Sequence, residues 1–349
     1  INAMAISLNS STYGELTDPF TGISDLETKT IKTPLNPDVT YSDDPLRMMR
    51  AIRFASQLNF EIENESYSSI CKNADRLSII SKERIAEELN KILLSKKPSV
   101  GLKLLFNTEL LHQFFPEMAQ LQGVEERGQF AHKDNFYHTL EVIDNIRKNT
   151  DNIWLIWAAL LHDIAKPQCK QFEEGHGWTF HGHEFLGGKM VSKIFKTLKL
   201  PLNEKMKYVK KLVTLHLRPI VLSQDIVTDS AIRRLLFDAG DDIDDLMTLC
   251  EADITSKNPK KVSRYINNFK LVRKKLKEIE EKDHIRNWQP PISGEEIMKI
   301  FNIEAGQEVG ILKNSLKDAI LDGKVKNEKE AAIEFMKLKA KEINLKSDD

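Results

Sequence analysis

The 349-residue chain has few cysteines, no long apolar run and almost no net charge. Its three cysteines are far apart and form no CxxC pair, which argues against a disulfide framework or a thiolate metal site and suits a reducing cytoplasm. No apolar stretch approaches the roughly 20 residues that cross a membrane, and no segment resembles a signal peptide. The formal net charge is -1, so a nucleic-acid site must be a local patch. These absences predict a cytoplasmic protein without membrane contact.

The sequence does have helical periodicity, which continues from about residue 41 almost to the end. Short strand-like segments separated by turns occur only in residues 1–40. Asp44 followed by Pro45 is typical of an N-cap and the first residue of a helix. Residues 173–188, rich in glycine and aromatics, are predicted to be a loop. The predicted fold class is mainly α with a small β remnant, and the length allows two or three domains.

Seven of the nine histidines fall between residues 132 and 216, and imidazole is the commonest protein metal ligand. Among them, His162 and Asp163 follow the apolar run WLIWAALL. A buried carboxylate without a partner is costly, so this pair needs a cation or hydrogen bonds. Two interpretations are open: a metal site, or a helix-end aspartate in water beside a half-buried histidine.

The order His, His-Asp, His, His, Asp along the chain resembles the signature of the HD superfamily of metal-dependent phosphohydrolases. The resemblance implies two divalent ions, the first on His138, His162, Asp163 and Asp253, the second on His183 and His216. Histidine and carboxylate ligands suit Mn, Ni, Co, Fe or Zn. The implied chemistry is phosphoester hydrolysis by a metal-activated water.

Two residues of this region are candidates for catalysis, Asp163 and Lys166. Lys166 follows His162 by four residues, where it either neutralises a phosphate oxygen or is an ordinary helix-end charge. Three further histidines are predicted to lie in loops or on the surface: His132, His176 and His181.

Three arginines in DDPLRMMRAIRF are spaced by three residues, so they occupy a helix arc of about 120°. They are Arg47, Arg50 and Arg53. From spacing alone they form either a binding face or a solvated arginine face, with Asp44 only an N-cap.

Segments 1–9, 14–26, 31–60 and SKERIAEEL together resemble the bacterial CCA-adding tRNA nucleotidyltransferase and poly(A) polymerase family, in the class that carries an HD domain. The match continues through DSAIRRLLFDAG and PPISGEEIM and so covers nearly all of the chain. The resemblance implies a nucleotide site on Asn2, Asp44, Arg47, Arg50 and Arg53.

The implied site has a chemical logic. Cytosine and adenine both present an amino donor beside a ring-nitrogen acceptor, which a carboxylate and a guanidinium complement. Asp44 with Arg47 would therefore select CTP and ATP, while Asp43 stands where the family usually has glutamate. Glu83 and Arg84 match a motif that we interpret as support for this helix.

The implied reaction adds C, A or both to the 3′ end of tRNA or another RNA, with Mg in the catalytic head. The family's paired catalytic aspartates, Gly-Ser phosphate loop and basic segment are not found in this sequence, so we expect an N-terminally truncated transferase that transfers nothing. The alternative function is a metal-dependent phosphodiesterase or phosphatase acting through the HD domain. A third interpretation is an inert RNA scaffold.

Residues 257–277 contain nine basic and no acidic side chains. Such a run is either a solvated face or a local site for RNA phosphates. Arg233 and Arg234 have the same two interpretations. The RNA-binding residues predicted in the run are Lys260, Lys261, Arg264, Lys270, Arg273 and Lys274.

The predicted organisation has four parts. They are a nucleotidyltransferase head remnant at 1–40, a helical neck with the nucleobase-reading helix at 41–128, an HD metal domain at 129–256 and a basic RNA-binding tail at 257–349.

Overall fold

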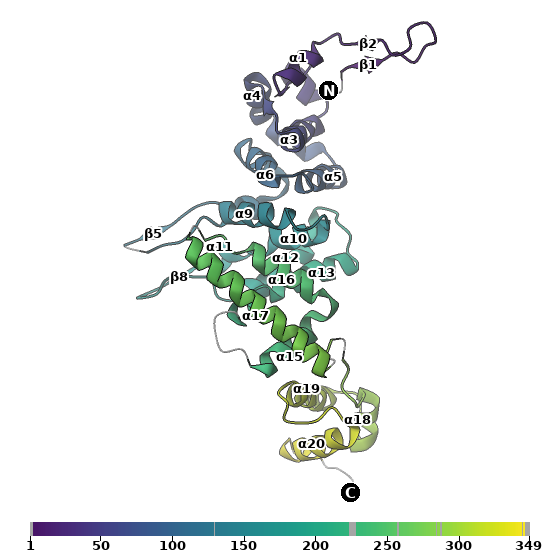
Figure 1. Cartoon of the computed structure of the whole chain (residues 1–349), viewed down its shortest axis with the longest axis vertical. Helices are drawn as coiled ribbons and strands as arrows, with labels where there is room; N and C mark the ends of the chain where they lie inside the picture. The colour runs from purple at the N-terminus through teal and green to yellow at the C-terminus, as the bar shows by residue number, and fades with distance from the viewer. Residues whose placement is uncertain are drawn as a thin grey trace. The chain divides into compact units, whose positions relative to one another are not determined.

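The computed structural model describes residues 3–128, 130–222, 228–256, 258–283, 285–286, 288–343 and 345. The prediction of a mainly α fold is confirmed, since the described strands are only two or three residues long (Figure 1). The chain divides into two compact units, one of residues 1–216 with 248–257 and one of residues 217–247 with 258–349. No described helix combines the length and apolar character needed to cross a bilayer.

The first unit is built from helices that follow one another through short connections. They are α1 (Gly22–Glu27), α2 (Pro37–Asp43), α3 (Leu46–Leu58), α4 (Asn64–Lys72), the 3-10 helix η1 (Ala74–Ile79), α5 (Lys82–Leu93), α6 (Pro98–Asn107), α7 (Leu110–Phe114), α8 (Pro116–Ala119), α9 (Asn135–Arg147), α10 (Ile153–Leu161), α11 (Lys166–Cys169), α12 (His183–Thr197) and α13 (Glu204–Leu215).

The second unit contains α14 (Leu217–Leu222), α15 (Asp229–Ala239), the 3-10 helix η2 (Gly240–Asp242), α17 (Pro259–Asp283), α18 (Gly294–Phe301), α19 (Gln307–Leu321) and α20 (Lys329–Glu342), and the division between the units falls inside α16 (Ile243–Ala252).

The strands of the first unit form four separate pairs. Three pairs are antiparallel: β1 (Ala5–Ile6) with β2 (Leu16–Thr17), β5 (Glu126–Arg127) with β6 (Phe130–Ala131), and β7 (Gln171–Glu173) with β8 (Gly177–Thr179). The fourth pair, β3 (Thr30–Ile31) with β4 (Glu61–Ile62), is parallel and joins the first segment to the end of α3.

Two boundaries differ from the sequence prediction. Helix α3 begins at Leu46 with Pro45 as its N-cap, one residue later than predicted, although Asp44 Oδ1 still accepts a hydrogen bond from the Leu46 amide (3.3 Å). Residues 173–188 are not one loop, because they contain part of the β7–β8 hairpin and the start of α12 at His183.

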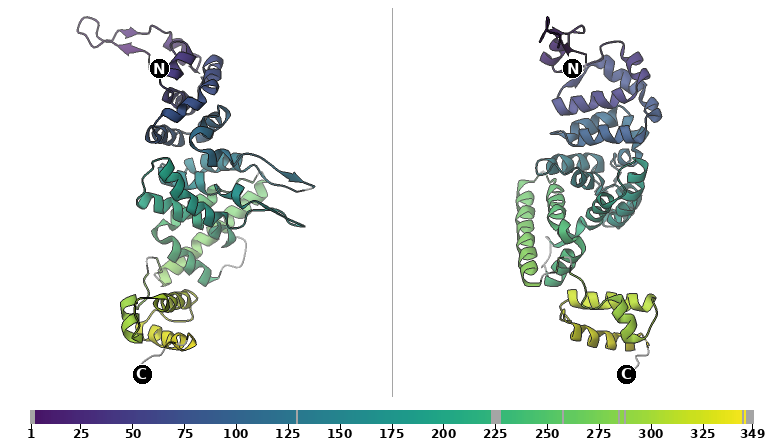
Figure 2. Two further views of the ribbon diagram at one scale, coloured as in Figure 1. Left: turned by 180° about the vertical axis from the view of Figure 1, so that it is seen from behind. Right: turned by 90° about the vertical axis from the view of Figure 1, so that its right-hand side faces the viewer.

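The neck helices α3, α5 and α6 pack side by side on an apolar core (Figure 2). In α3, Met48, Met49 and Ile52 are fully buried, while Arg47 is exposed and Arg50 is half-buried. An apolar stripe at this spacing is what an amphipathic helix buries.

Helix α9 is tied to the neck by polar contacts at its C-terminal half. The Asp144 carboxylate accepts hydrogen bonds from the amide (3.0 Å) and hydroxyl (2.6 Å) of Ser99, at the start of α6. Arg147 donates to the carbonyls of Leu94 (3.0 Å) and Ser95 (3.2 Å). These contacts satisfy backbone groups at the end of α5 and the start of α6 that have no helical partner.

Helix α10 makes a similar contact. The indole of Trp157 is fully buried and donates from Nε1 to Asn90 Oδ1 of α5 (2.8 Å). The same ring lies near Phe115 and Phe195, with centroids 6.3 and 6.0 Å away. The core of the first unit therefore continues from the neck into the histidine-rich region.

In the second unit, ion pairs connect α15 to later helices. Arg233 Nε lies 2.7 Å from Asp283 Oδ2, and Arg234 lies 3.1 Å from Asp318 and 2.7 Å from Asp322. Both arginines, whose proposed RNA role is untested, thus have acidic partners inside this unit.

Candidate metal centre and nucleotide pocket

The six predicted metal ligands come together at the ends of four helices and on the side of a fifth, all within the first unit. His138 lies on α9, His162 and Asp163 follow α10, His183 begins α12, His216 follows α13 and Asp253 follows α16. Because most of these residues lie at helix ends, their side chains can reach one common site while the helices pack against one another.

Asp163 is the centre of the cluster. Its Oδ2 lies 3.2 Å from His162 Nε2 and 3.5 Å from His138 Nε2, and its Oδ1 lies 3.3 Å from His183 Nε2 and 3.9 Å from His216 Nε2. One carboxylate therefore faces two histidine pairs, one with each oxygen.

The cluster forms two groups that share Asp163. In the first, ligand atoms of His138, His162 and Asp163 lie within 4.8 Å of one another; the second has the same compactness with Asp163, His183 and His216. Asp253 belongs to the first side, since its Oδ1 lies 2.9 Å from His138 Nε2 and 3.6 Å from His162 Nε2.

Each histidine directs Nε2 into the cluster and uses Nδ1 outside it. Nδ1 of His162, His183 and His216 lies 2.7 Å from the carbonyl three residues earlier. The fourth, His138, has its Nδ1 3.0 Å from the Thr255 hydroxyl. Hydrogen-bonded Nδ1 with a free Nε2 is the arrangement of metal-ligating histidine.

Burial and charge shift the pKa values of these groups. Burial lowers the pKa of His162, but the Asp163 and Asp253 carboxylates outweigh this and raise it to about 10. Burial also lowers the pKa of His216, to about 4. Although burial opposes ionisation of Asp163, the charges of His162 and Lys166 hold its pKa well below the usual range. The carboxylates are thus kept as anions in a buried site.

The cluster fits a divalent cation. His162 is fully buried, and its Nε2 has no hydrogen-bond partner among the described residues. A buried ring nitrogen beside two carboxylates and three further imidazoles is a donor set for a transition metal. One ion would be held by His138, His162, Asp163 and Asp253, and a second by Asp163, His183 and His216.

Lys166 borders the cluster. Its Nζ lies 2.6 Å from Asp163 Oδ2 and 5.6 Å from the centre of the Phe180 ring. The predicted catalytic pair is therefore in contact.

The remaining histidines of the region are placed apart from the ligand groups. His181 is exposed and lies 3.5 Å from Glu173, His176 is exposed, and His132 packs against Trp178 and Phe180. Thr255 was not foreseen, because a hydroxyl that supports a ligand has no spacing signature in the sequence.

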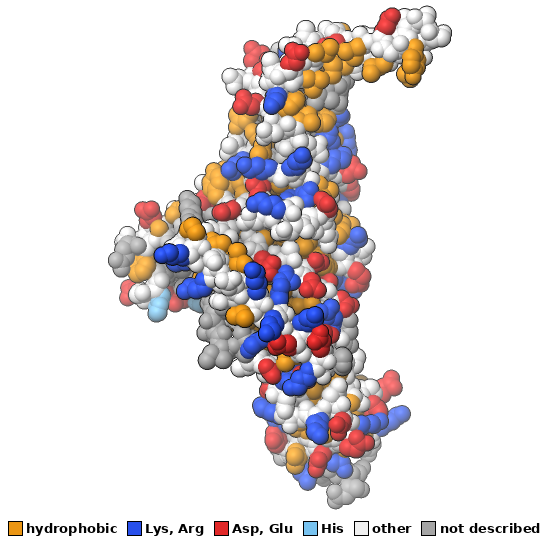
Figure 3. Space-filling view, viewed as in Figure 1, with side chains coloured by type: hydrophobic (Ala, Val, Ile, Leu, Met, Phe, Trp, Pro, Cys, Tyr) orange, Lys and Arg blue, Asp and Glu red, His pale blue; other side chains and the backbone are white. Residues whose placement is uncertain are grey.

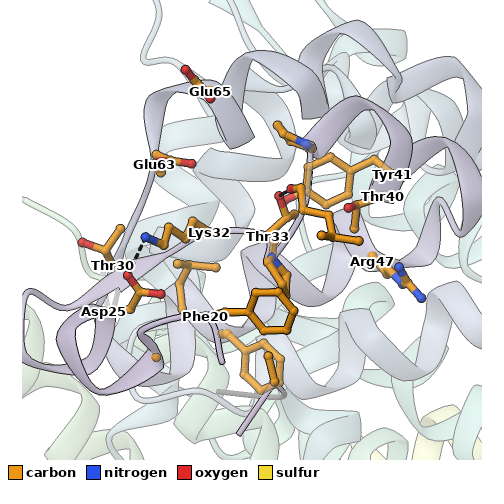
Figure 4. A pocket seen from close by; sticks show the side chains of 18 of the residues that line it. Phe20, Asp25, Thr30, Lys32, Thr33, Thr40, Tyr41, Arg47, Glu63 and Glu65 are labelled. Atoms are coloured by element: carbon orange, nitrogen blue, oxygen red, sulfur yellow. Dashed lines mark hydrogen bonds and ion pairs between the residues drawn. The ribbon is translucent and has the colours of Figure 1, made fainter. Parts of the chain in front are cut away.

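The predicted nucleotide site borders a pocket of about 880 Å³ in the first unit (Figure 4). Arg47 and Arg50 of α3 line it, together with Tyr41 and Phe54. Arg47 lies at one side, and Glu63 and Glu65 lie at the other, near the Lys32–Asp25 ion pair (3.1 Å). The pocket therefore combines guanidinium groups, an acidic side and aromatic walls.

The other predicted nucleotide residues are placed differently. Asp44 does not line the pocket; its carboxylate lies 3.9 Å from both Arg47 Nε and Arg84 Nη2. Arg53 does not line it either and is paired with Glu88 of α5 at 2.9 Å. Asn2 lies outside the described residues. The contact of Arg84 with Asp44 agrees with its expected support of this helix.

The predicted RNA-binding residues lie on α17, whose acidic side chains begin only at Glu278, and Figure 3 shows the Lys and Arg side chains of this face of the molecule in blue and the acidic ones in red. Lys260, Lys261, Arg264, Lys270 and Lys274 are exposed. Arg273 is half-buried and lies 3.4 Å from Asp244. Buried Phe269, Val272, Leu276 and Ile279 form the opposite face of the helix.

Comparison with known proteins first defines the class of the histidine-rich region. Residues 135–258 match the HD domain, and residues 59–121 match the family described as the probable RNA and SrmB-binding site of polymerase A. The region around Asp163 is thus an HD domain.

Two relatives that cover most of the chain are tRNA nucleotidyltransferases. The A-adding tRNA nucleotidyltransferase of Deinococcus radiodurans is 29% identical over 327 residues, with 90% of this chain and 73% of that protein covered. The CC-adding tRNA nucleotidyltransferase of Thermus thermophilus is 27% identical over 327 residues, with 89% and 70% covered. The Bacillus stearothermophilus CCA-adding enzyme, solved in complex with CTP, shares the fold at a TM-score of 0.62, with 21% identity and 98% and 72% covered. The resemblance is confirmed: two regions of the chain match the HD domain and the polymerase A RNA-binding family, and its relatives and structural neighbours are tRNA nucleotidyltransferases and CCA-adding enzymes.

Proposed function

We propose that the chain selects the nucleotide and binds the RNA for an enzyme that adds C, A or both to tRNA 3′ ends. The observation that carries this proposal is the pocket lined by Arg47 and Arg50, which adjoins the Asp44 carboxylate. Its relatives named A-adding and CC-adding support the substrate class, CTP or ATP with tRNA.

The side chains of this site suit the bases of CTP and ATP. A guanidinium donates to the ring-nitrogen acceptor of cytosine or adenine, and a carboxylate accepts from the neighbouring amino group. Guanine and uracil present the opposite polarity, which would leave these groups unpaired and so disfavour GTP and UTP. Arg50, in the same pocket, would then hold the ribose or triphosphate, and Asn2 and Arg53 remain predicted contacts.

The sequence holds no pair of aspartates in the family's catalytic motif, where the resemblance places Mg. Without such carboxylates two-metal phosphoryl transfer has no ligands. We propose nucleotide binding as the property to measure on this chain.

Binding of the four nucleoside triphosphates by the full chain tests the proposal. Saturation-transfer NMR should give stronger signals for CTP and ATP than for UTP and GTP, and Arg47→Ala should remove that preference. Lys72→Ala is the matched control, because Lys72 is an exposed cation paired with Asp38 outside the pocket. Equal signals for all four nucleotides in the wild-type chain would contradict the proposal.

A second function is proposed for the HD domain, hydrolysis of a phosphodiester or phosphomonoester. The observation favouring it is the convergence of four Nε2 atoms and two carboxylates, which an inert scaffold does not need. A bound Mn, Ni, Co, Fe or Zn ion supplies a water of lowered pKa as nucleophile.

The side chains around the ions have separate tasks in this function. Asp163 holds both histidine pairs in register and remains an anion at neutral pH. The ammonium of Lys166 lies at the edge of the cluster, where it would bind a substrate phosphate oxygen. Burial of His162, Asp163 and His216 keeps bulk water out of the ligand set.

Turnover of 2′,3′-cyclic AMP and of bis(p-nitrophenyl) phosphate with Mn²⁺, Ni²⁺ or Mg²⁺ tests the second function. We expect hydrolysis that depends on the metal and is abolished by Asp163→Ala. A folded chain that hydrolyses neither substrate with any metal would leave the HD domain as an RNA scaffold.

A further inference from the structure

One histidine of the metal centre differs from the other three in the hydrogen-bond partner of its Nδ1. For His162, His183 and His216, the partner of Nδ1 is a main-chain carbonyl within the same helix end or turn. The corresponding carbonyl for His138, that of Asn135, accepts instead from the Thr139 hydroxyl (2.8 Å). Nδ1 of His138 therefore has its hydrogen-bond partner in another part of the chain.

That partner is Thr255, whose Oγ1 lies 3.0 Å from His138 Nδ1 although the residues are 117 positions apart. We infer that Thr255 is a positioning residue for His138, and through it for the metal on that side of the cluster. This inference rests on the proposed metal-binding function of the HD domain.

The segment 253–255 holds the imidazole from both sides. Asp253 Oδ1 lies 2.9 Å from Nε2, and the Thr255 hydroxyl lies 3.0 Å from Nδ1. The two nitrogens lie on opposite sides of the ring, so the two contacts together fix its orientation. Thr255 is buried with 9% of its surface exposed, so water does not readily take the place of its hydroxyl.

The hydroxyl also suits the tautomer that a metal requires. A neutral imidazole that binds a cation through Nε2 carries its proton on Nδ1, and a hydroxyl oxygen can accept that hydrogen bond. Loss of such an outer partner weakens metal affinity by about 10- to 100-fold in comparable sites. The side of the cluster with His183 and His216 should not be affected.

A titration of the full metal-free chain with Co²⁺, followed by the visible d–d absorption, tests the inference. The variants are Thr255→Val, which keeps the shape and removes the hydroxyl, and Thr255→Ser, which restores it. Thr139→Val is the matched control, because Thr139 is also buried and adjoins His138, but among the described residues its hydroxyl donates to the main-chain carbonyl of Asn135. His183→Ala marks the step that belongs to the other side.

We expect Thr255→Val to weaken one Co²⁺ step by about 10- to 100-fold, with the His183-dependent step changed less than threefold. Thr255→Ser and Thr139→Val should both stay within threefold of the wild type. A folded Thr255→Val protein with both steps unchanged overturns the inference, and so does an equal loss in Thr139→Val.

A second measurement separates this inference from the metal function itself. If the wild-type chain gives no d–d bands at all, the metal function fails, and the position of His138 is then tested by its ring ¹⁵N resonances in the metal-free protein. Thr255→Val should shift these resonances, while Thr139→Val should not. Unshifted resonances in Thr255→Val overturn the role of Thr255.

Discussion

Arg53 Nη1 of α3 lies 2.9 Å from Glu88 Oε2 of α5, and both side chains are nearly buried, with 12% and 6% of their surfaces exposed. Lys91 reaches the other oxygen of the same carboxylate at 3.0 Å. The pair holds together the two neck helices, one of which carries Arg47 and Arg50.

Removal of this carboxylate should destabilise the neck. Glu88→Ala leaves the Arg53 guanidinium buried without its partner, which typically costs about 3–5 kcal/mol of unfolding free energy. The neighbouring exposed Glu87→Ala should change it by less than about 0.5 kcal/mol. Urea denaturation of both variants measures the difference, and a loss below about 1 kcal/mol in Glu88→Ala would show the pair to be dispensable.

The shared position of Asp163 predicts unequal metal losses from two similar substitutions. Asp163→Asn should remove both bound metals, because its two oxygens face different histidine pairs. Asp253→Asn should weaken only one, since the ligand atoms that its carboxylate approaches among the described residues are those of His138 and His162. Metal content after dialysis, measured by mass spectrometry, checks the stoichiometry. Retention of one metal in Asp163→Asn would disprove the bridging role.

The exposed lysines of α17 predict a change in the salt dependence of tRNA binding. Reversal of Lys260 and Lys270 to glutamate should weaken binding and lower the slope of log K against log salt by about one for each RNA phosphate that is no longer neutralised. The control reverses Lys205 and Lys207 of α13, which are exposed and lie outside the predicted RNA-binding tail. Filter binding at several salt concentrations gives both quantities. Equal losses in both double variants would indicate general charge repulsion only.

Acid should destabilise the second unit through Glu296. The ammonium of Lys329 at 2.6 Å and the capping box with Ser293 lower the pKa of Glu296 to about 2. Because the folded pKa lies below the unfolded value near 4.5, this stabilisation is present above pH 4.5 and is lost as the pH falls toward 2.

Thermal melting of the second unit between pH 6 and pH 2.5 checks this expectation. Glu296→Gln should melt lower than the wild type at pH 6, and the two midpoints should converge at low pH. The neighbouring exposed Glu295→Gln should follow the wild-type curve. A constant gap between Glu296→Gln and wild type at every pH would rule out the ion pair as its cause.

The convergence of the predicted metal ligands could be anticipated because their chemistry is unusual for a helical protein. The histidine–aspartate pair after WLIWAALL needs a cation or hydrogen bonds, and the resemblance to the HD signature adds the later histidines and Asp253 to the set. The division of Asp163 between two groups could not be predicted, because it depends on how the ends of α10, α12 and α13 converge in space.

The three arginines of α3 show a limit of sequence periodicity, which predicts the face of a helix but not the partner of each side chain. Spacing by three residues places Arg47, Arg50 and Arg53 on one arc of α3. The packing of the helices decides which partner each arginine has. Arg47 and Arg50 line the pocket, whereas Arg53 contacts Glu88 of α5, which lies 35 residues later in the chain. The β7–β8 hairpin was missed for another reason: three-residue strands are too short to show an alternating pattern.

The contacts of α9 with the neck have a consequence for how this HD domain can be inherited or exchanged. A segment starting at Asn135 would carry Asp144 and Arg147 away from the Ser99, Leu94 and Ser95 groups that they satisfy. The neck half would then expose unpaired main-chain groups at the cut, and the HD half would expose the side chains of Asp144 and Arg147 without these partners. The HD domain is thus not a freely portable module, and transplanting it into another protein requires α5 and α6 to travel with it.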